Sequence, residues 1–312
     1  PIMRCRVYKQ PMLDLERVKN DDRLLRAVTG LNLKALEALK PSFATALAAA
    51  PIPRRSQQPR ERAVGGGRKP RLASVEAKLI YILFYFKCYP TFDLAGLLFD
   101  LDRSQAHRWM HRLQPVLEAA LGQQLALPQR KLRSMAEFVA AFPEVERVIL
   151  DATERPVQRS KDKDKQKANY SGKQKRHTRS HLALVEPDRK ILVLSHAYAG
   201  RHNDQGILNR EGWAEWIPDA VLIQGDLGFF GLHNEVVNVE LPHKKPRGGQ
   251  LSDEQKAENQ ALASERVVCE HSFAGLKRYG IAHQVYRNRK EGFDDRSMVT
   301  AAGLWNFYLE AA

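Results

Sequence analysis

The sequence predicts a mixed α/β protein, in which an all-helical N-terminal part precedes a C-terminal domain that contains a β-sheet. In the first part, apolar residues recur at the three- and four-residue spacing of helices; in the second, short β-branched runs alternate with helical patterns. A long helical pattern over residues 253–279 follows the last of these runs. With 312 residues, of which 43% are hydrophobic and 28% charged, the chain has enough apolar side chains for two or three folded units.

The charge is strongly positive and unevenly distributed. Fifty Lys and Arg residues stand against 36 Asp and Glu residues, which gives a net charge of +14. Residues 51–73 contribute +6 and residues 155–181 contribute +8, so these two segments account for the whole excess. A basic excess gathered in this way indicates a polyanionic partner, and nucleic acid is the common one.

The cysteines and the apolar runs exclude several classes of protein. Cys5, Cys88 and Cys269 are too few and too far apart for a disulfide framework or a cysteine-rich zinc site, which favours a reducing compartment. The longest apolar run, residues 79–86, is much shorter than a membrane span, and the first residues lack the pattern of a signal peptide. We therefore expect an intracellular protein without a membrane partner.

The N-terminal 73 residues divide by composition. Residues 1–50 are expected to form a helical segment, since apolar positions recur at helical spacing from Asp14 onward. Residues 51–73 are rich in Pro, Gly, Gln and Arg and predict a flexible basic linker.

Residues 74–122 predict three helices in the order of a helix-turn-helix domain. Ser74 is expected to cap the first helix, which runs to Lys87, and Thr91 the second, over residues 92–99. After the four residues 100–103, Ser104 is expected to cap a third helix over residues 105–113. A connection of this length between the second and third helices is typical of a helix-turn-helix.

The third helix of this domain has one apolar face and one polar face. Ala106, Met110 and Leu113 share the apolar face, which is expected to point inward. A recognition helix needs polar and basic side chains near its N-terminus, where they reach base edges and phosphates. The alternative is a solvated helix in an ordinary three-helix unit; the turn spacing and the basic linker favour DNA binding. The residues of the polar face are Ser104, Gln105, His107, Arg108, His111 and Arg112.

A link over residues 123–146 leads to the second domain, residues 147–312, in which five strands are expected. Two of them form a hairpin through the turn at residues 186–189. A helical stretch over residues 204–216 comes before the fourth strand, and Trp213 and Trp216 are expected to pack that stretch onto the sheet. The expected strands are residues 147–150, 181–185, 191–196, 220–224 and 236–241.

Three carboxylates stand at separate corners of this domain. Asp151 directly follows the first expected strand, Asp226 follows the fourth, and Glu270 lies within the long helix. Carboxylates in such positions can converge in the fold, and hard oxygen ligands are those that Mg²⁺ requires. Each one alone is more often a turn, cap or surface residue, so the joint placement carries the prediction. Asp204 competes for the second position, but it lies at an expected helix start, where capping is its natural role.

The long helix adds two cations to this pattern. Arg266, Glu270 and Lys277 are four and seven residues apart, which places them on one face of the helix. That arrangement suits a metal ligand flanked by phosphate-binding groups. An ordinary surface ion pair between Arg266 and Glu270 is the alternative.

At these motifs the sequence resembles the insertion-sequence DDE transposases of the bacterial group related to the Harbinger elements. The resemblance covers about residues 74–290. The matching motifs, in order, are Asp-Ala-Thr-Glu-Arg-Pro at 151–156, Tyr-Ser-Gly-Lys-Gln-Lys-Arg-His-Thr at 170–178, Gly-Arg-His-Asn-Asp at 200–204, Gly-Asp-Leu-Gly-Phe at 225–229, and Arg266, Glu270 and Lys277. The sequence departs from the pattern at Ala263, where related groups carry Tyr, and at Phe229, where a Tyr is common.

The resemblance implies a ribonuclease H-like catalytic domain preceded by the helix-turn-helix domain. It implies a transposase that binds terminal inverted repeats of double-stranded DNA and performs metal-dependent strand cleavage and strand transfer. It also implies two Mg²⁺ or Mn²⁺ ions, a homodimer or larger homo-oligomer on DNA, and, in a bacterium, a cytoplasmic location at the nucleoid. The implied catalytic acids and metal ligands are Asp151, Asp226 and Glu270, and the expected DNA contacts outside the third helix are Lys173, Lys175, Arg266 and Lys277.

Two other functions are compatible with the same sequence. A domesticated DNA-binding protein would keep the fold without the chemistry, although intact acids argue against it. An endonuclease would cut DNA without joining it.

Overall fold

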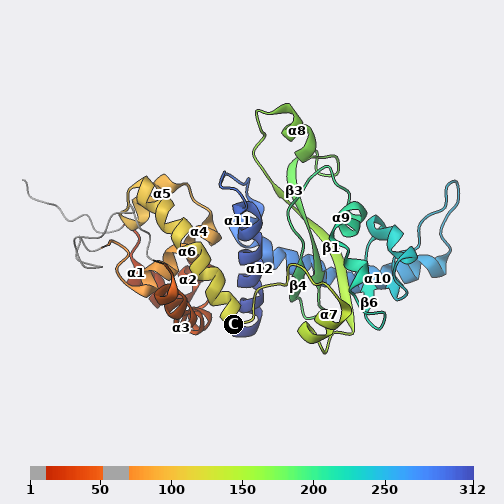
Figure 1. Ribbon diagram of the computed structural model, residues 1–312, viewed down its shortest axis with the longest axis horizontal. Coiled ribbons are helices and arrows are strands. Elements are labelled where there is room, and N and C mark those ends of the chain that lie inside the picture. The colour runs from red at the N-terminus through yellow and green to blue at the C-terminus, as the bar shows by residue number, and fades with distance from the viewer. Residues whose placement is uncertain (1–11, 52–69) are drawn as a thin grey trace, which may run out of the picture. The chain divides into compact units, whose positions relative to one another are not determined.

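The computed structural model describes residues 12–51 and 70–312, which fall into two compact units (Figure 1). The first holds the described residues up to Ala126 together with Glu310–Ala312, and the second holds Leu127–Leu309. Most of the expected basic linker, residues 52–69, lies outside the described residues. Within the described ranges, no helix has both the length and the apolar content needed to cross a bilayer.

The first unit is all-helical. The expected N-terminal helical segment contains three helices, and these pack on the helices that follow: α2 contacts α4, and α3 contacts both α4 and α6. The two stretches therefore share one core. The helices are α1 (Leu15–Asn20), α2 (Asp22–Thr29), α3 (Leu33–Ala49), α4 (Val75–Cys88), α5 (Phe92–Phe99) and α6 (Arg103–Gln123).

The caps of α4 and α5 are the predicted ones, whereas the predicted cap of α6 is wrong. Ser74 and Thr91 each accept a hydrogen bond from a backbone N–H of the first turn of their helix. In α6 the cap is Asp102 rather than Ser104, because Gln105 completes a capping box by accepting from the Asp102 N–H at 3.1 Å. The predicted recognition helix thus begins two residues earlier than expected, at Arg103, and ends ten residues later, at Gln123.

A glycine sets the close approach between α5 and α6. The Leu101 N–H donates to the Gly96 carbonyl at 2.8 Å, and a Cβ on Gly96 would stand only 2.5 Å from the Leu101 carbonyl oxygen. Ala106, Met110 and Leu113 are fully buried below this turn, as predicted.

The second unit is built on a mixed sheet with the strand order β2-β3-β1-β6-β7, and β4 and β5 also pair with β3. β1 runs antiparallel to β3 and parallel to β6, and β6 runs parallel to β7. The predicted hairpin is confirmed as β3 and β4. The strands are β1 (Arg147–Pro156), β2 (Tyr170–Ser171), β3 (Arg176–Val185), β4 (Ile191–Leu194), β5 (Tyr198–Ala199), β6 (Leu222–Gln224) and β7 (Val239–Glu240).

Several strand predictions need correction. β3 begins at Arg176, five residues before the expected start, and β2 and β5 lie outside the expected strands. β4 and β6 are each two residues shorter than expected, β4 at its end and β6 at its start. β1 does not end at Leu150: it continues to Pro156, paired residue by residue with β3, so Asp151 lies inside the strand. Two charged side chains of this extension have partners. Glu154 accepts from the Ser171 and Thr178 hydroxyls, and the Arg155 guanidinium donates to the Ser297 hydroxyl at 2.8 Å and to the Asp294 carbonyl at 2.6 Å. The fifth predicted strand is reduced to the two residues of β7.

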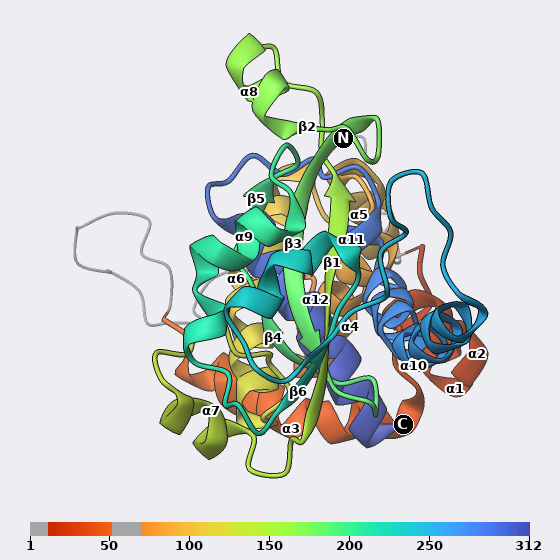
Figure 2. The same ribbon diagram turned by 90° about the vertical axis from the view of Figure 1, so that its right-hand side faces the viewer.

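Helices cover both faces of the sheet. In Figures 1 and 2, α9 and α12 lie on opposite sides of β1 and β3. On the α9 side, Leu150 and Leu182 of the strands form one core cluster with Trp213 and Trp216, which confirms the predicted packing of the two tryptophans. The helices are α7 (Met135–Ala141), α8 (Lys163–Asn169), α9 (Asp204–Glu211), α10 (Asp253–Lys277), α11 (Gly280–His283) and α12 (Phe293–Ala311), with 3₁₀ helices η1 (Trp213–Glu215) and η2 (Leu227–Asn234).

Several helical assignments differ from expectation, and α8 also lies where no helix was expected. The stretch over residues 204–216 breaks at Gly212, which adopts φ +63° between α9 and η1. The expected link contains α7, and the long helix α10 is followed by α11 and α12. The last of these belongs to the domain core, since the Asn306 side chain accepts from the Ile191 N–H and donates to the Ile191 carbonyl, both at 2.9 Å.

Candidate active site

Asp151 lies within β1, on the strand that pairs with β3 on one side and β6 on the other. Its carboxylate is half-buried and accepts a hydrogen bond from the Ala152 N–H at 2.7 Å. Burial raises the pKa of Asp151, and the Asp226 carboxylate adds to this, while Arg266 and Lys173 oppose it. The site therefore holds an acid whose negative charge is incompletely compensated.

Asp226 follows β6 after Gly225 and caps η2 by accepting from the Gly228 N–H at 2.8 Å. Gly228 lies between two carboxylates: a Cβ there would stand 2.8 Å from Asp226 Oδ1 and 3.4 Å from Asp204 Oδ2. The Gly-Asp-Leu-Gly motif thus uses its second glycine to let Asp204 and Asp226 approach one another.

Asp204 is the first residue of α9, and the cap of that helix is its neighbour Asn203, so the predicted capping role for Asp204 is wrong. Burial raises the pKa of Asp204. Lys173, whose ammonium lies 3.8 Å from the Asp204 carboxylate, lowers it. The carboxylates of Asp226 and Asp151 raise the Asp204 pKa further. The structure therefore brings three aspartates within electrostatic reach of each other.

Glu154, which the sequence analysis did not select, stands at the margin of this cluster. It accepts hydrogen bonds from the hydroxyls of Ser171 and Thr178 and contributes to the raised pKa of Asp204. Its position in the motif at 151–156 was a sign that Glu154 belongs to the site. Only the pairing of β3 with both β1 and β2 shows that the Ser171 and Thr178 hydroxyls are its hydrogen-bond partners.

The long helix α10 presents Cys269 and Arg266, more than Glu270, toward Asp151. Cys269 is fully buried, and burial together with its interaction with Asp151 raises the pKa of the thiol. Glu270 is exposed, and the carboxylate that acts on Asp151 from the neighbouring elements is that of Asp226. Within residues 12–51 and 70–312, no three His, Cys, Asp or Glu side chains are arranged to hold a metal ion.

The two cations predicted on α10 are both half-buried, and both lie within electrostatic range of Asp151. Burial lowers the pKa of Lys277, while Asp151 and Glu154 act in the opposite direction. Arg266 and Lys277 therefore belong to the surroundings of the carboxylate cluster.

Lys173 and Lys175 lie in the turn between β2 and β3, and both are exposed. Figure 1 shows this hairpin end and α8 extending beyond the end of β3. Lys173 connects the exposed β2–β3 turn with the carboxylate cluster. Its ammonium reaches Asp204, while most of its side chain stays in solvent.

In the helical unit, the predicted DNA contacts gather at the start of α6. Ser104, His107 and Arg108 are exposed and line a hollow of about 590 Å³ together with Phe92, Asp102 and Arg103. Gln105 is occupied with the helix cap, and Arg112 is half-buried with its guanidinium 5.1 Å from the Trp109 ring.

Comparison with known proteins places this arrangement in a family. Residues 150–306 match the family described as DDE superfamily endonuclease, and residues 70–123 match the helix-turn-helix of DDE superfamily endonuclease. The chain is 30% identical over 244 residues to the "Probable transposase for insertion sequence element IS702" of Microchaete diplosiphon, which covers 78% of this chain and 83% of the relative. No solved structure matches the chain significantly. The chain thus belongs to the DDE superfamily endonucleases, among the insertion-sequence DDE transposases.

Proposed function

We propose that this protein binds the terminal inverted repeats of its own insertion sequence and catalyses metal-dependent cleavage and strand transfer of the DNA. The observation that carries the proposal is the cluster of Asp151, Asp204 and Asp226 at the sheet, in a chain of the DDE endonuclease family. The sheet order, with an antiparallel β1–β3 pair beside parallel β6, supports a ribonuclease H-like fold for this unit.

The donor set at the cluster fits a divalent cation. Asp151 and Asp226 offer hard oxygen ligands. Burial, together with the Asp226 carboxylate, raises the pKa of Asp151, so a bound divalent cation would offset this unfavourable negative charge. These two residues would hold the metal, and Glu270 would join them through a change of its side chain or of α10. When bound, a divalent cation supplies Lewis acidity for activating a water or a 3′-hydroxyl and for stabilising the leaving oxygen.

The chain's own residues would position the DNA strand around this site. Arg266 and Lys277 flank Asp151 from α10 and supply positive charge for the scissile phosphate. Lys173 reaches the opposite margin of the cluster from the β2–β3 turn. Ser104, His107 and Arg108 at the N-terminus of α6 would contact the DNA of the terminal repeat.

Cleavage and joining of a labelled terminal-repeat duplex in Mg²⁺ test the proposal. The native chain is expected to cut and join, and Asp226→Asn to do neither while it still binds the duplex. Full activity of Asp226→Asn would contradict the assignment of that acid. Binding without cleavage by the native chain would identify a DNA-binding protein that lacks the chemistry, and cleavage without joining would identify an endonuclease.

Recognition by the helical unit has a separate test. Arg108→Ala is expected to weaken binding to the terminal repeat and to leave the fold intact, as measured by a gel-shift titration and circular dichroism. Unchanged binding would count against α6 as the recognition helix.

A further inference from the structure

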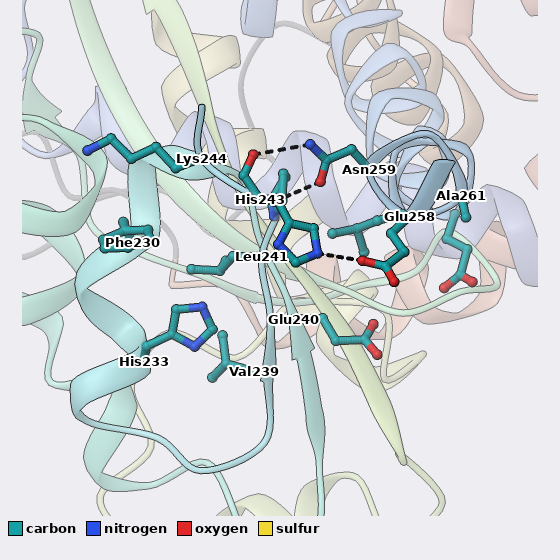
Figure 3. Close-up of a pocket in the computed structure, with 13 residues that line it drawn as sticks. Phe230, His233, Val239, Glu240, Leu241, His243, Lys244, Glu258, Asn259 and Ala261 are labelled. Atoms are coloured by element: carbon teal, nitrogen blue, oxygen red, sulfur yellow. Dashed lines mark hydrogen bonds and ion pairs between the residues drawn. The ribbon is translucent and has the colours of Figure 1, made fainter. Parts of the chain in front are cut away.

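A hollow of about 670 Å³ lies beside η2, on the side of β7 and α10 (Figure 3). Phe230 and His233 of η2 form one wall, and Glu258 and Asn259 of α10 form part of the opposite wall (Figure 3). The segment after β7, with His243 and Lys244, runs between them. A volume of this size is typical of sites for small organic groups.

The aromatic wall stands close to the carboxylate cluster along the chain. Asp226 caps η2, and Phe230 follows it by four residues, just after the kink of this segment at Phe229. Phe229 is fully buried in the core, whereas Phe230 is 50% exposed, so the Phe-Phe pair anchors η2 and offers one ring to solvent. A half-exposed Phe beside a hollow is a surface on which a planar group can stack.

Both carboxylates and cations line the hollow. Glu240 of β7 accepts a hydrogen bond from the Gln224 side-chain amide at 2.9 Å. The carboxylates on the α10 side are already engaged: Glu258 pairs with His243 at 2.5 Å, and Glu265 pairs with Arg147 at 2.7 Å. The Lys244 ammonium lies 5.3 Å from the centre of the Phe230 ring. In the described parts of the chain, Lys244 has no carboxylate partner within ion-pair distance, and neither do its neighbours Lys245 and Arg247.

We infer that this hollow receives an unpaired base of the DNA strand that is processed at Asp226, with the base stacked on Phe230 and the adjacent phosphate at Lys244. The inference rests on the proposed function for the identity of the strand. Base–aromatic stacking is tolerant of sequence, and an adjacent cation for the phosphate completes the usual pair of contacts to single strands. A base entering the Lys244 face of the ring displaces the ammonium, which then meets the phosphate.

Fluorescence of 2-aminopurine tests the inference. The probe is a forked duplex whose unpaired strand of three nucleotides carries 2-aminopurine, mixed with the full chain in EDTA so that no cleavage takes place. Stacking on Phe230 is expected to quench the fluorescence. Phe230→Ala is expected to abolish the quenching and to weaken binding of the fork by about tenfold to a hundredfold, with little effect on a fully paired duplex of the same sequence. Phe230→Trp is expected to keep both.

Val237→Ala is the matched control, because Val237 is 86% exposed after the same 3₁₀ helix but carries no ring; it should bind the fork like the native chain. The inference would be overturned if Phe230→Ala bound the fork as tightly as the native chain does. A change of oligomeric state caused by Phe230→Ala without DNA would also overturn it, if fork binding were unchanged, since the hollow would then be a protein contact. If the proposed function is wrong, the native chain will instead fail to cleave DNA in Mg²⁺, and the quenching in EDTA can still be measured.

Discussion

Asp151 has a negative charge that its folded surroundings disfavour. Burial and the nearby Asp226 carboxylate raise its pKa, so the folded protein loses stability as the pH rises through that raised value. Below the pKa of the unfolded chain the penalty is absent. Such a cost is expected at a candidate active site, because groups selected for chemistry are often not the most stable choice.

Asp151→Asn should therefore stabilise the metal-free protein at neutral pH while it abolishes cleavage. The expected gain is on the order of 1 kcal/mol, or about 2–4 °C in Tm for a unit of this size. Thermal unfolding in EDTA at pH 7.5 and pH 4.5 checks it, since the gain should shrink at the lower pH. The exposed Asp219→Asn serves as a control that should leave Tm unchanged. A lower Tm of Asp151→Asn at pH 7.5 would refute this account.

The sequence predicts part of the residue-scale arrangement. Asp226 and its glycines are recognisable because a strand end followed by Gly-Asp-x-Gly is a local feature. Asp204 and Glu154 are harder to select, since their neighbours come from elements more than fifteen residues away, such as Asp226 for one and Thr178 for the other. Which face of α10 turns toward Asp151 also depends on packing, and the buried Cys269 on that face interacts with Asp151.

At the scale of elements, the helix-turn-helix depends on the contact between α5 and the turn before α6. A Cβ at Gly96 would collide with the backbone oxygen of Leu101, which cannot move away as a flexible side chain could. Gly96→Ala is therefore expected to destabilise the helical unit by about 1–3 kcal/mol. Urea unfolding followed by circular dichroism measures the loss. Gly172→Ala, where a Cβ meets nothing within 4 Å, should have no comparable effect; similar losses for both would exclude the contact as the cause.

The last helix is attached to the sheet domain by a half-buried ion pair near its N-terminus. Asp295 of α12 pairs with Arg130 at 2.5 Å, and its carboxylate also faces His181, which is fully buried on β3. Although burial opposes it, these partners lower the pKa of Asp295 to about 2. The stabilisation is therefore present above about pH 4 and is lost as the pH falls through about 2.

Asp295→Asn should cost about 2–3 kcal/mol at neutral pH, because the Arg130 guanidinium is left half-buried without its counter-charge. Chemical denaturation at pH 7 checks this, and the difference from the native chain should narrow at pH 2. Asp294→Asn is the control, since its carboxylate makes only a longer pair of 3.6 Å with Arg179 and should cost less than about 1 kcal/mol. Equal costs for the two variants would contradict the role given to Asp295.

The same helix shows why element prediction from the sequence was incomplete. Helices α4, α5 and α10 have recognisable caps or long polar faces, and they were predicted. In α12, by contrast, a continuous run from Ser297 to Phe307 is buried, so the helix lacks the alternation of faces on which an amphipathic pattern depends. α7 was missed for another reason: with seven residues it is too short for a periodic signal.

For the whole molecule, the net charge of +14 indicates a polyanionic partner whose affinity should depend on the salt concentration. One of the two basic segments, residues 155–181, includes α8 and the β2–β3 turn next to the carboxylate cluster. In α8 the side chains of Lys163, Asp164 and Lys167 are exposed, and no residue of this helix is buried. α8 has three Lys residues against one Asp and adds no side chain to the core, so it is suited to contacts with phosphates.

If α8 contacts the DNA backbone, its charges should alter affinity according to their sign. Lys163→Gln with Lys167→Gln should weaken binding to duplex DNA and reduce the slope of log K against log salt by up to about 1.8, since each phosphate contact contributes about 0.9. Asp164→Asn should do the opposite and strengthen binding, because it removes a repulsive charge without disturbing the helix cap, which is Asp162. Titrations over 50–200 mM KCl measure both quantities. Arg23→Gln with Lys34→Gln, exposed residues of α2 and α3, removes the same net charge elsewhere. An equal effect of the two double variants would show that affinity follows total charge alone. A larger effect of the α8 double variant, together with stronger binding by Asp164→Asn, would place the phosphate backbone along α8.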